Sequence, residues 1–556
     1  MIFRSALFRW WLFFGLVVTS CVLLLPDYGT SWDESARKRG GEAKLAYYTY
    51  LLGYSDDVES TEVRRDLYPG FFDLSLALIR RVSPFSDIIT GHAFSLFFGL
   101  LGVLATARLA ERLRPGSGLW AAAGLLLYPR YFGHMFINPK DIPFAAMYIV
   151  SLWAMVWCLQ ARTSREEWVR LLVFGVIGGL TAATRIPGVI VFVYFGVALL
   201  LLKMWRHFQQ QKADGDRGIA MFGKVGLMIG VGALIGFLIL LLFWPYLHGD
   251  PFARGAGALR QVADFDWEFP VYFWGEYLSA KELPLSYLPT WFLLTTPILF
   301  FPVFLAALWS FRQWMLSKGA SHRPLVTISL SILTMSIVFP LFFVIFSGAT
   351  LYNGVRHVLF IVPPTIVLLA IGWHRWLNCE WIRHARYARP AVFVVLAAMS
   401  LPVVAALFKL HPYQYTYFNE LAGGVGTASR QFESEYWGTS YKEAAASLVD
   451  YLNKLPFEET EGKVFSVNME HPTWLFTPYL PESTSGYTLQ VGRSIGESAD
   501  FYVANTVWGS HHWWAGDVVR VIERDKAAFC VVKDRRRLVG EQRAMYYTLP
   551  EEKKGL

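Results

Sequence analysis

The sequence predicts a polytopic α-helical membrane protein with a small external α/β domain at its C-terminal end. Three observations predict this fold class. Long apolar runs that carry few charges recur along the first 408 residues. Basic residues gather on alternate short loops between these runs, and the composition changes to that of a soluble domain after Leu410. A run of about 20 apolar residues is long enough to cross a bilayer as a helix.

The length criterion gives about eleven transmembrane spans. The apolar runs are 7–25, 88–106, 119–128, 142–159, 168–183, 187–202, 222–244, 287–309, 325–346, 358–373 and 391–407. The run 119–128 is the shortest of them. The first run has the position of a signal peptide, but the residues after Cys21 stay apolar, so we interpret this run as a membrane anchor.

The formal net charge of +8 is explained by the positions of the basic residues. Arginines and lysines follow the second, fourth, sixth and eighth runs and lie between the last two, so alternating spans place them all on one side. The positive-inside rule assigns that side to the cytoplasm. The prediction is therefore a plasma (inner) membrane protein with a cytoplasmic N-terminus, an external C-terminal domain and no nucleic-acid partner.

The chain divides into a membrane module, residues 1–408, and an external domain, residues 409–556. The longer polar segments of the module are predicted to be external loops at 27–84, 129–141 and 246–286. Within the first loop, the apolar spacing from Tyr68 to Arg81 predicts an amphipathic surface helix. In the external domain, the pattern predicts a helix at 442–452 and strands at 463–467, 501–505, 518–522 and 528–533.

The segment NPKDIP, Asn138 to Pro143, is charged although it lies between two apolar runs. Capping explains part of this composition, because asparagine favours the N-cap and aspartate the first helical turn. It does not explain Lys140, nor Arg130 and His134 just upstream. A helix N-terminus flanked by cations is suited to bind phosphate. The segment is therefore a candidate phosphate-binding site that contains Asp141.

A second polar stretch, DYGTSWDE, follows the first apolar run and ends in Asp33 and Glu34. These carboxylates either cap the next helix or supply a general base that takes a proton from a hydroxyl group. Further cations lie at the external ends of later spans, and each either anchors its helix or contacts phosphate. They are Arg185, Arg356 and His357.

These motifs together resemble those of the GT-C glycosyltransferases, and most closely the protein O-mannosyltransferase and aminoarabinose transferase branch. The resemblance depends on the acidic pair after the first span and on the segment Pro129 to Ala145. The runs HPYQYTYFNELAGG (411–424) and SEYWGTSYKEA (434–444) are similar to bacterial members. The second loop has no DxD motif, and Asp141 is its single acidic residue.

The resemblance implies an enzyme that moves a sugar from a polyprenyl-phosphate donor, such as an undecaprenyl-phosphate sugar, to a lipid, polysaccharide or protein acceptor. It implies inverting displacement on the external face, with Asp33 as the base, Glu34 beside it and Asp141 as the second acidic residue. Lys140, His134, Arg130, Arg185, Arg356 and His357 are then the candidates for binding donor phosphate. A divalent metal (Mg, Mn or Zn) at Asp141 is left open.

Two other classes of protein remain as alternatives. A secondary transporter or lipid flippase would place its charges near the membrane midplane, on interrupted helices. A receptor would bind envelope glycans through the C-terminal domain without chemistry. The spans here are largely free of charge, and the ionisable groups lie at their outer ends. That placement favours an enzyme.

Overall fold

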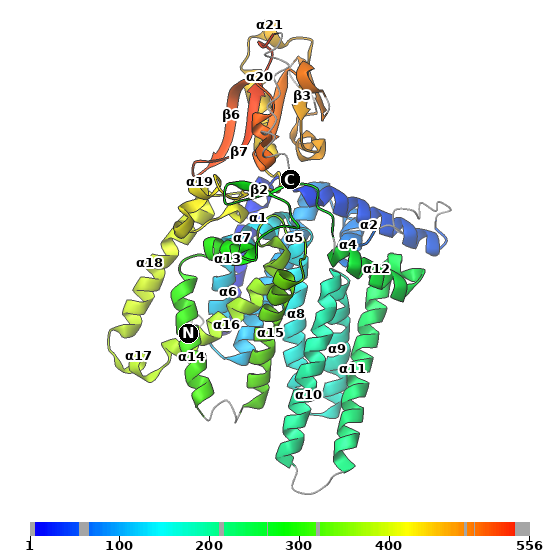
Figure 1. Ribbon diagram of the computed structural model, residues 1–556, viewed down its shortest axis with the longest axis vertical. Coiled ribbons are helices and arrows are strands. Elements are labelled where there is room, and N and C mark those ends of the chain that lie inside the picture. Colours follow the sequence, from blue (N-terminus) through cyan, green and yellow to red (C-terminus); the bar gives the residue numbers. More distant parts are fainter. Residues whose placement is uncertain are drawn as a thin grey trace.

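The computed structural model describes residues 6–54, 66–210, 216–263, 265–317, 323–482, 486–493 and 495–539. A bundle of long helices carries a smaller α/β domain at one end (Figure 1). The long helices of the bundle are α1 (Ala6–Leu24), α5 (Asp87–Leu113), α8 (Asp141–Leu159), α9 (Ser164–Ala182), α10 (Ile190–Gln210), α11 (Asp216–Phe243), α15 (Pro324–Phe346), α16 (Val362–Leu377) and α18 (Ala388–Lys409). This architecture confirms the predicted fold class of a polytopic membrane protein with a C-terminal α/β domain.

The number of spans differs from the predicted eleven. Among the described residues, eight helices are long and apolar enough to cross a membrane, or nine if one bent pair counts as a single span. The predicted span at 119–128 is only the nine-residue α6 (Gly118–Leu126). The predicted span at 287–309 is the bent pair α13 (Tyr287–Thr295) and α14 (Phe300–Leu316), whose axes differ by 107°. Charges in the first turns of α9 keep that helix below the apolar threshold.

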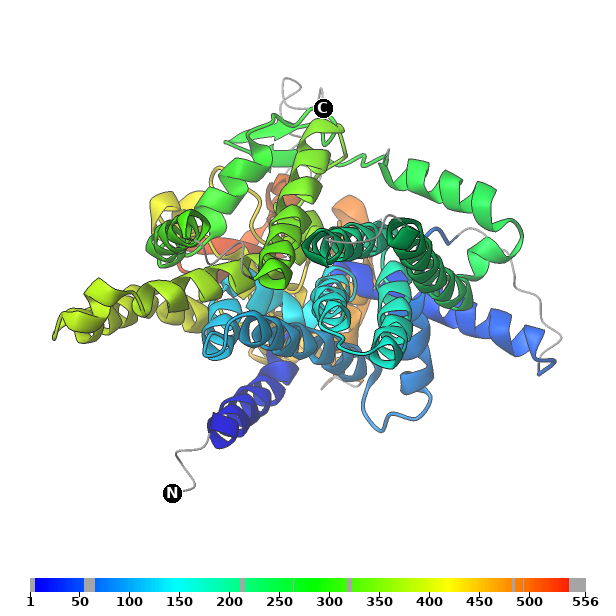
Figure 2. The ribbon, with the colours of Figure 1, turned by 90° about the horizontal axis from the view of Figure 1, so that it is seen from below.

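The helices differ in how far they are enclosed. Most residues of α5, α8 and α16 are buried, whereas α1 and α18 bury few of theirs. Seen from below, α1 stands at the edge of the bundle (Figure 2). The enclosed helices matter for the site because Asp141 begins α8, and Arg356 begins the 3-10 helix η5 (Arg356–Ile361) that leads into α16.

Further helices lie where the bundle meets the C-terminal domain (Figure 1). The sequence-predicted surface helix corresponds to α4 (Phe71–Arg80), and the loops around it also contain α2 (Trp32–Leu51) and α12 (Pro251–Ala263). Ion pairs hold α2 against α4, because Arg37 contacts Asp73 at 2.9 Å and buried Lys44 contacts both Asp66 and Asp73. This network fixes the position of α2, whose first turn carries the candidate base.

The C-terminal domain contains a five-stranded sheet in the order β4-β3-β5-β7-β6. The strands are β3 (Lys463–Met469), β4 (Tyr487–Gly492), β5 (Phe501–Asn505), β6 (Asp517–Arg524) and β7 (Ala527–Asp534). Strand β3 pairs in parallel with β4 and β5, while β5, β7 and β6 pair antiparallel. Helix α20 (Tyr441–Asn453) packs against β5, β6 and β7. The predicted helix and four strands are confirmed, and β4 is the strand that the sequence analysis missed.

Residues 410–440 connect α18 to α20, and we call this segment the strap. Its aromatic side chains are buried rather than exposed, as in Tyr413, Tyr415, Tyr417 and Trp437. It packs against α7 (Pro129–Ile137) through the short helix at 414–416. It also pairs with the small hairpin of β1 (Val271–Phe273) and β2 (Glu276–Leu278), where Phe273 bridges Phe432. The strap therefore joins the two parts of the molecule by packing.

Candidate active site

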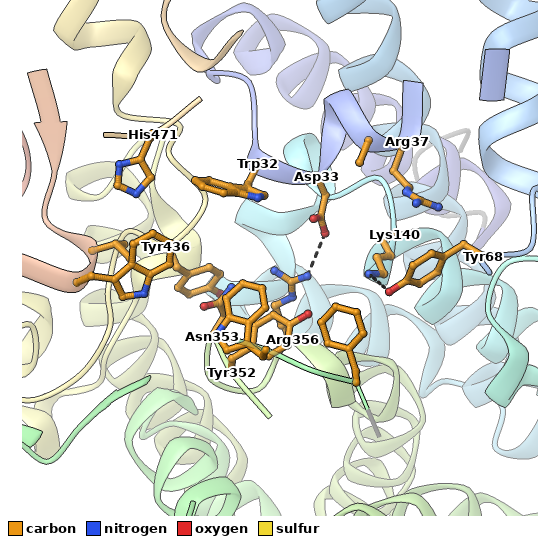
Figure 3. A pocket seen from close by; sticks show the side chains of 15 residues that line it. Trp32, Asp33, Arg37, Tyr68, Lys140, Tyr352, Asn353, Arg356, Tyr436 and His471 are labelled. Carbon is orange, nitrogen blue, oxygen red and sulfur yellow. Dashed lines mark hydrogen bonds and ion pairs between the residues drawn. The ribbon is translucent and has the colours of Figure 1, made fainter. Parts of the chain in front are cut away.

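A cavity of about 240 Å³ lies between the bundle and the C-terminal domain. Figure 3 shows the side chains that line it. The lining comes from segments that are far apart in the sequence: Trp32, Asp33, Ala36, Arg37, Tyr68, Lys140, Phe265, Trp267, Tyr352, Asn353, Arg356, Tyr436, His471, Val507 and Trp508. Both polar stretches singled out in the sequence therefore contribute to one cavity.

Asp33 reaches the cavity because the start of α2 is fixed on two sides. The Ser31 hydroxyl donates to the carbonyl of Ile137 at 2.6 Å, which ties this segment to the end of α7. The backbone N–H of Trp32 donates to the carbonyl of Trp437 in the strap, at 2.9 Å. Glu34 and Ser31 form a capping box at the helix start, which satisfies orphan N–H groups. The first turn of α2 is therefore held between bundle and strap.

The NPKDIP segment is organised by the buried side chain of Asn138. Its Oδ1 accepts the backbone N–H groups of Lys140 and Asp141, at 3.0 and 2.7 Å. Its Nδ2 contacts His134 Nδ1 at 2.9 Å and Asp141 Oδ2 at 3.1 Å. Helix α8 begins at Asp141, one residue after Lys140. Asn138 thus turns the chain so that Lys140 enters the cavity and Asp141 lies behind it.

Acidic and basic side chains alternate at the inner wall of the cavity and directly behind it. Arg356 Nη2 donates to Asp33 Oδ2 at 3.0 Å, and Arg356 Nε lies 3.5 Å from Asp141 Oδ2. Arg185 pairs with the other oxygen of Asp141. Arg356 is buried and lies over the rings of Trp437 and Tyr352, 4.5 and 5.2 Å from their centroids. This packing holds the guanidinium group of Arg356 in one place between the two carboxylates.

The charges around Asp33 favour its ionised form. Burial by itself raises the pKa of Asp33, but the positive charges of Arg356 and Lys140 outweigh burial and hold the pKa below the ordinary value of 3.8. Asp33 is therefore a carboxylate at neutral pH. It is also only partly exposed, because its side chain retains 19% of its accessible area. A partly shielded carboxylate that faces a cavity can accept a proton from a bound hydroxyl group.

Cations and a tyrosine gather at one end of the cavity. Lys140 Nζ donates to the hydroxyl of Tyr68 at 3.1 Å and lies 4.2 Å from the centre of its ring. Arg37 lies over the same ring at 4.5 Å. Burial raises the pKa of Tyr68, but Lys140, Arg185 and Arg37 together outweigh it, so that the pKa lies below its usual value. Within the described residues Lys140 has no ion pair, which leaves its charge available to an anion.

The remaining predicted site residues lie behind the cavity wall. Glu34 caps α2 and contacts His92 Nε2 at 3.2 Å, and it does not line the cavity. His134 is buried between Asn138 and Tyr436, and burial lowers its pKa to about 3. Arg130 donates to the carbonyl of Tyr417 at 3.2 Å and is buried beside Trp291 and Phe418. His357 lies edge-on to Tyr352, outside the cavity lining.

The sequence analysis did not single out several residues that line the cavity. Arg37 was detectable in principle, because it follows Asp33 by four positions and shares its face of α2. Tyr68 lies in the first loop, directly before a Pro-Gly pair. His471 and Trp508 come from the C-terminal domain, and only the tertiary fold brings them to the cavity. The C-terminal domain thus contributes to the lining of the cavity, a role that the sequence left open.

The surroundings of Asp141 do not fit a divalent metal. One carboxylate oxygen pairs with Arg185, and the other contacts Asn138 and Arg356. A metal cation there would face two guanidinium groups at close range, and its remaining ligands would have to come from elsewhere. Among the described ranges, no group of three or more His, Cys, Asp or Glu side chains could hold a metal ion. Arginine, rather than a metal, neutralises this carboxylate.

Fold and site together define a polytopic membrane protein with a charged cavity between its helical bundle and an extramembrane domain. Solved structures of similar overall arrangement include ArnT from Cupriavidus metallidurans bound to undecaprenyl phosphate. That match has a TM-score of 0.47 and 14% sequence identity, and it covers 95% of this chain and 98% of ArnT. The apo form of the same ArnT matches with a TM-score of 0.46 over the same shares.

The oligosaccharyltransferase of Archaeoglobus fulgidus, tethered to an acceptor peptide, is similar at a TM-score of 0.42 and 12% identity. This match covers 72% of the present chain and 53% of the oligosaccharyltransferase. No family model matches the chain, and no curated protein does.

Proposed function

We propose that this protein is a membrane glycosyltransferase that takes a sugar from a polyprenyl-phosphate donor and transfers it to an acceptor hydroxyl group. The observation that carries the proposal is the pairing of Asp33 with Arg356 at the wall of a cavity that also holds Lys140. Such a displacement needs a carboxylate that accepts a proton and cations that stabilise the departing phosphate, and both are present here. Phosphate leaves as a stable anion, so no general acid is required.

The proposed step is a single displacement with inversion at the anomeric carbon. Asp33 accepts the proton of the acceptor hydroxyl group. At the same time the oxygen of that hydroxyl group forms a bond to the anomeric carbon. The bond between that carbon and the phosphate oxygen breaks, and the electron pair leaves with the phosphate. Arg356 and Lys140 stabilise the negative charge of the departing phosphate. Asp141 acts as a positioning residue, because it holds Arg356 from behind.

One end of the cavity fits this direction of reaction. Lys140, Tyr68 and Arg37 form the cationic end, where phosphate would bind. Lys140 is also the N-cap residue of α8, so the positive end of that helix dipole adds to its charge. Arg185 supports the same end indirectly through its pair with Asp141.

We further infer that the cavity faces the side of the membrane opposite the cytoplasm. The far ends of α10, α11, α14 and α15, together with α17 (Glu380–His384), lie away from the C-terminal domain (Figure 1). Those ends carry Arg206, Arg312 and Arg383. By the positive-inside rule, that end belongs in the cytoplasm and the C-terminal domain outside. A cysteine at Arg386 should then resist an impermeant thiol reagent in intact cells, and one at Gly486 should react.

The distribution of charge argues against a transporter. Asp33, Asp141 and Arg356 lie at helix starts. Asp33 and Arg356 line a cavity that residues of the C-terminal domain also line. A transporter would instead place such groups near the midplane of interrupted helices. The cavity also lies between bundle and C-terminal domain and is not a path through the bundle.

Asp33→Asn is the primary test of the proposed function. The amide keeps the size of the side chain but cannot accept the proton, so transfer should fall by at least about a hundredfold. Undecaprenyl phosphate should still bind, because its proposed contacts lie at the cationic end. Asp27→Asn is the matched control, since Asp27 pairs with His411 outside the cavity and should leave transfer unchanged. Product formation by Asp33→Asn at the wild-type rate would refute the base.

Transfer itself can be measured without knowing the sugar. Envelope glycans and glycolipids of a deletion strain would be compared by mass spectrometry with those of strains complemented by wild type, Asp33→Asn or Asp27→Asn. The expected result is one glycan species that only wild type and Asp27→Asn restore. Identical glycan profiles in the deletion and wild-type strains would refute a role in glycan transfer.

A further inference from the structure

The cavity has a second end that the proposed reaction has not used. Figure 3 places Arg37, Lys140 and Tyr68 on one side of Asp33, and Trp32, His471 and Tyr436 on the other. We call the second side the aromatic end, made by Trp32, Trp267, Tyr352, Tyr436, His471 and Trp508. Of the described residues that line the cavity, all the basic side chains other than His471 belong to the opposite end or to the centre.

The aromatic end is held in a defined shape. Trp508 stacks on Phe269 with ring centres 4.2 Å apart, and on His471 at 5.3 Å. Trp32 meets both His471 and Trp508 edge-on. The backbone of Trp508 is left-handed, with φ of 57°, a conformation that costs free energy in a residue other than glycine. The packing of three segments therefore keeps the indole of Trp508 in an otherwise unfavourable position.

His471 offers an unused hydrogen-bond donor at this end. Its ring is buried, and burial lowers its pKa to about 3, so it is neutral at pH 7. The hydroxyl of Tyr441 accepts the N–H of Asn505 at 3.1 Å and contacts His471 Nδ1 at 2.9 Å. If the hydroxyl donates its proton to Nδ1, the ring carries its own proton on Nε2. Within the described residues, Nε2 has no hydrogen-bond partner.

A buried donor without a partner costs free energy, and a ligand oxygen would remove that cost. Aromatic faces carry partial negative charge and attract the C–H groups of a pyranose ring. The aromatic end therefore combines a flat apolar surface with one donor and no charged side chain of its own, and the nearest cation is Arg356 at the centre of the cavity, 5.2 Å from the Tyr352 ring. This combination suits a neutral carbohydrate and disfavours a phosphate group or an acidic peptide, which would need cations.

The direction of the proposed reaction assigns this end to the acceptor. In an inverting displacement, the acceptor attacks on the face of the sugar opposite the leaving group. With phosphate at Lys140, the acceptor must approach from the other side of Asp33, where Trp32 and Trp508 lie. The geometry points to an acceptor subsite for a neutral carbohydrate ring, completed by Trp508 and His471 of the C-terminal domain. This inference rests on the proposed function.

The direct test is saturation-transfer NMR on the full chain in nanodiscs loaded with undecaprenyl phosphate. The probes are neutral methyl hexopyranosides and, separately, short peptides that contain serine and threonine. Glycosides should give signals with wild type that fall at least about fivefold in Trp508→Ala, because truncated aromatic anchors lose most of their contact. Trp508→Phe should restore part of the signal, and His471→Phe should lower it.

Trp274→Ala is the matched control. Trp274 also has a left-handed backbone, with φ of 54°, but its side chain is 54% exposed and lies outside the cavity lining. The Trp274→Ala variant should bind glycosides as wild type does. Undecaprenyl phosphate should bind all these variants equally in native mass spectrometry, which also verifies that Trp508→Ala is folded.

Three outcomes would overturn the acceptor subsite. They are signals from peptides instead of glycosides, glycoside signals unchanged in Trp508→Ala, and no glycoside signal with wild type. These results are distinct from failure of the proposed function, which is judged by glycan transfer in Asp33→Asn. A wild-type rate in that variant would refute the base even if glycosides bind at Trp508.

Discussion

Asp33 and Arg356 lie 323 positions apart in the sequence and form an ion pair of 3.0 Å. The contact joins the start of α2 to the segment that precedes α16. Asp141 approaches the same guanidinium group at 3.5 Å, so the arginine is shared between the two polar stretches. This pair sets both the charge of the proposed base and the place where negative charge can be stabilised.

Arg356→Gln should shift the acid limb of the pH-rate profile to higher pH. In wild type the pKa of Asp33 is below 3.8, so the carboxylate stays ionised as the pH falls from 7 to 5 and activity should hold. Without the positive charge of Arg356, less of the pKa increase caused by burial is cancelled, so the pKa of Asp33 rises. Activity should then fall at a pH where wild type remains active. An acid limb at the same pH in both proteins would contradict this account.

Lys140→Ala should weaken the binding of undecaprenyl phosphate about tenfold, the effect expected when one charge-assisted contact is lost. Isothermal titration on protein in nanodiscs would measure it. Lys38→Ala is a suitable control, because Lys38 pairs with exposed Asp87 away from the cavity. Equal affinities for Lys140→Ala and Lys38→Ala would place the phosphate elsewhere.

Asp141→Asn should destabilise the protein by about 3–5 kcal/mol, because it leaves two arginines at least partly buried without their shared partner. If Asp141 only complemented the helix dipole, the loss would stay below about 1 kcal/mol. Unfolding in detergent, followed by intrinsic fluorescence, separates the two values. Asp87→Asn, at an exposed pair, should cost less than about 1 kcal/mol.

Removal of divalent metals should leave transfer unchanged. Both oxygens of Asp141 already contact cationic or amide groups of the protein. Membranes treated with EDTA would be assayed for the glycan species described above, with and without added Mg²⁺, Mn²⁺ or Zn²⁺. A loss that one of these ions restores would show that a metal acts in the reaction.

Glu433→Gln should stabilise the protein in alkaline buffer. Burial raises the pKa of Glu433 to about 8, while its Oε2 accepts the N–H of Asn353 at 3.1 Å. Because the folded pKa exceeds the unfolded value of 4.5, wild-type stability should fall as the pH rises between 4.5 and about 8, by at most about 1.4 kcal/mol per pH unit. Glutamine keeps the acceptor without the charge. Melting temperatures at pH 6 and pH 9 should therefore differ less in the variant.

Much of the site could be predicted from the sequence because it lies at the ends of apolar runs. Asp33, Lys140 and Arg356 are ionisable groups where lipid-facing segments stop, and all three line the cavity. Sequence position alone could not separate Asp33 from Glu34, since both suit a first helical turn. In the structure, the capping box with Ser31 occupies the side chain of Glu34, and Asp33 faces the cavity.

Other assignments depended on tertiary packing. Arg130 and His134 belong to the same segment as Lys140, but α7 carries both of them into the interior. Trp508 and His471 are separated from Asp33 by more than 400 positions, and no local pattern connects them. The predicted count of eleven spans is not confirmed, since the described residues contain eight candidate spans, or nine if the bent pair counts as one. A composition rule cannot detect the bend between α13 and α14, because both halves are equally apolar.

The strap has a consequence for how such a protein can change over generations. Tyr436 and Trp437 belong to the polypeptide that links the last long helix to α20, yet one lines the cavity and the other supports Arg356. A gene fusion made after Lys409 would separate the helices from strap residues that line or support the cavity. Recombination could therefore not exchange the C-terminal domain as an independent module. Bundle, strap and sheet must be inherited as one unit.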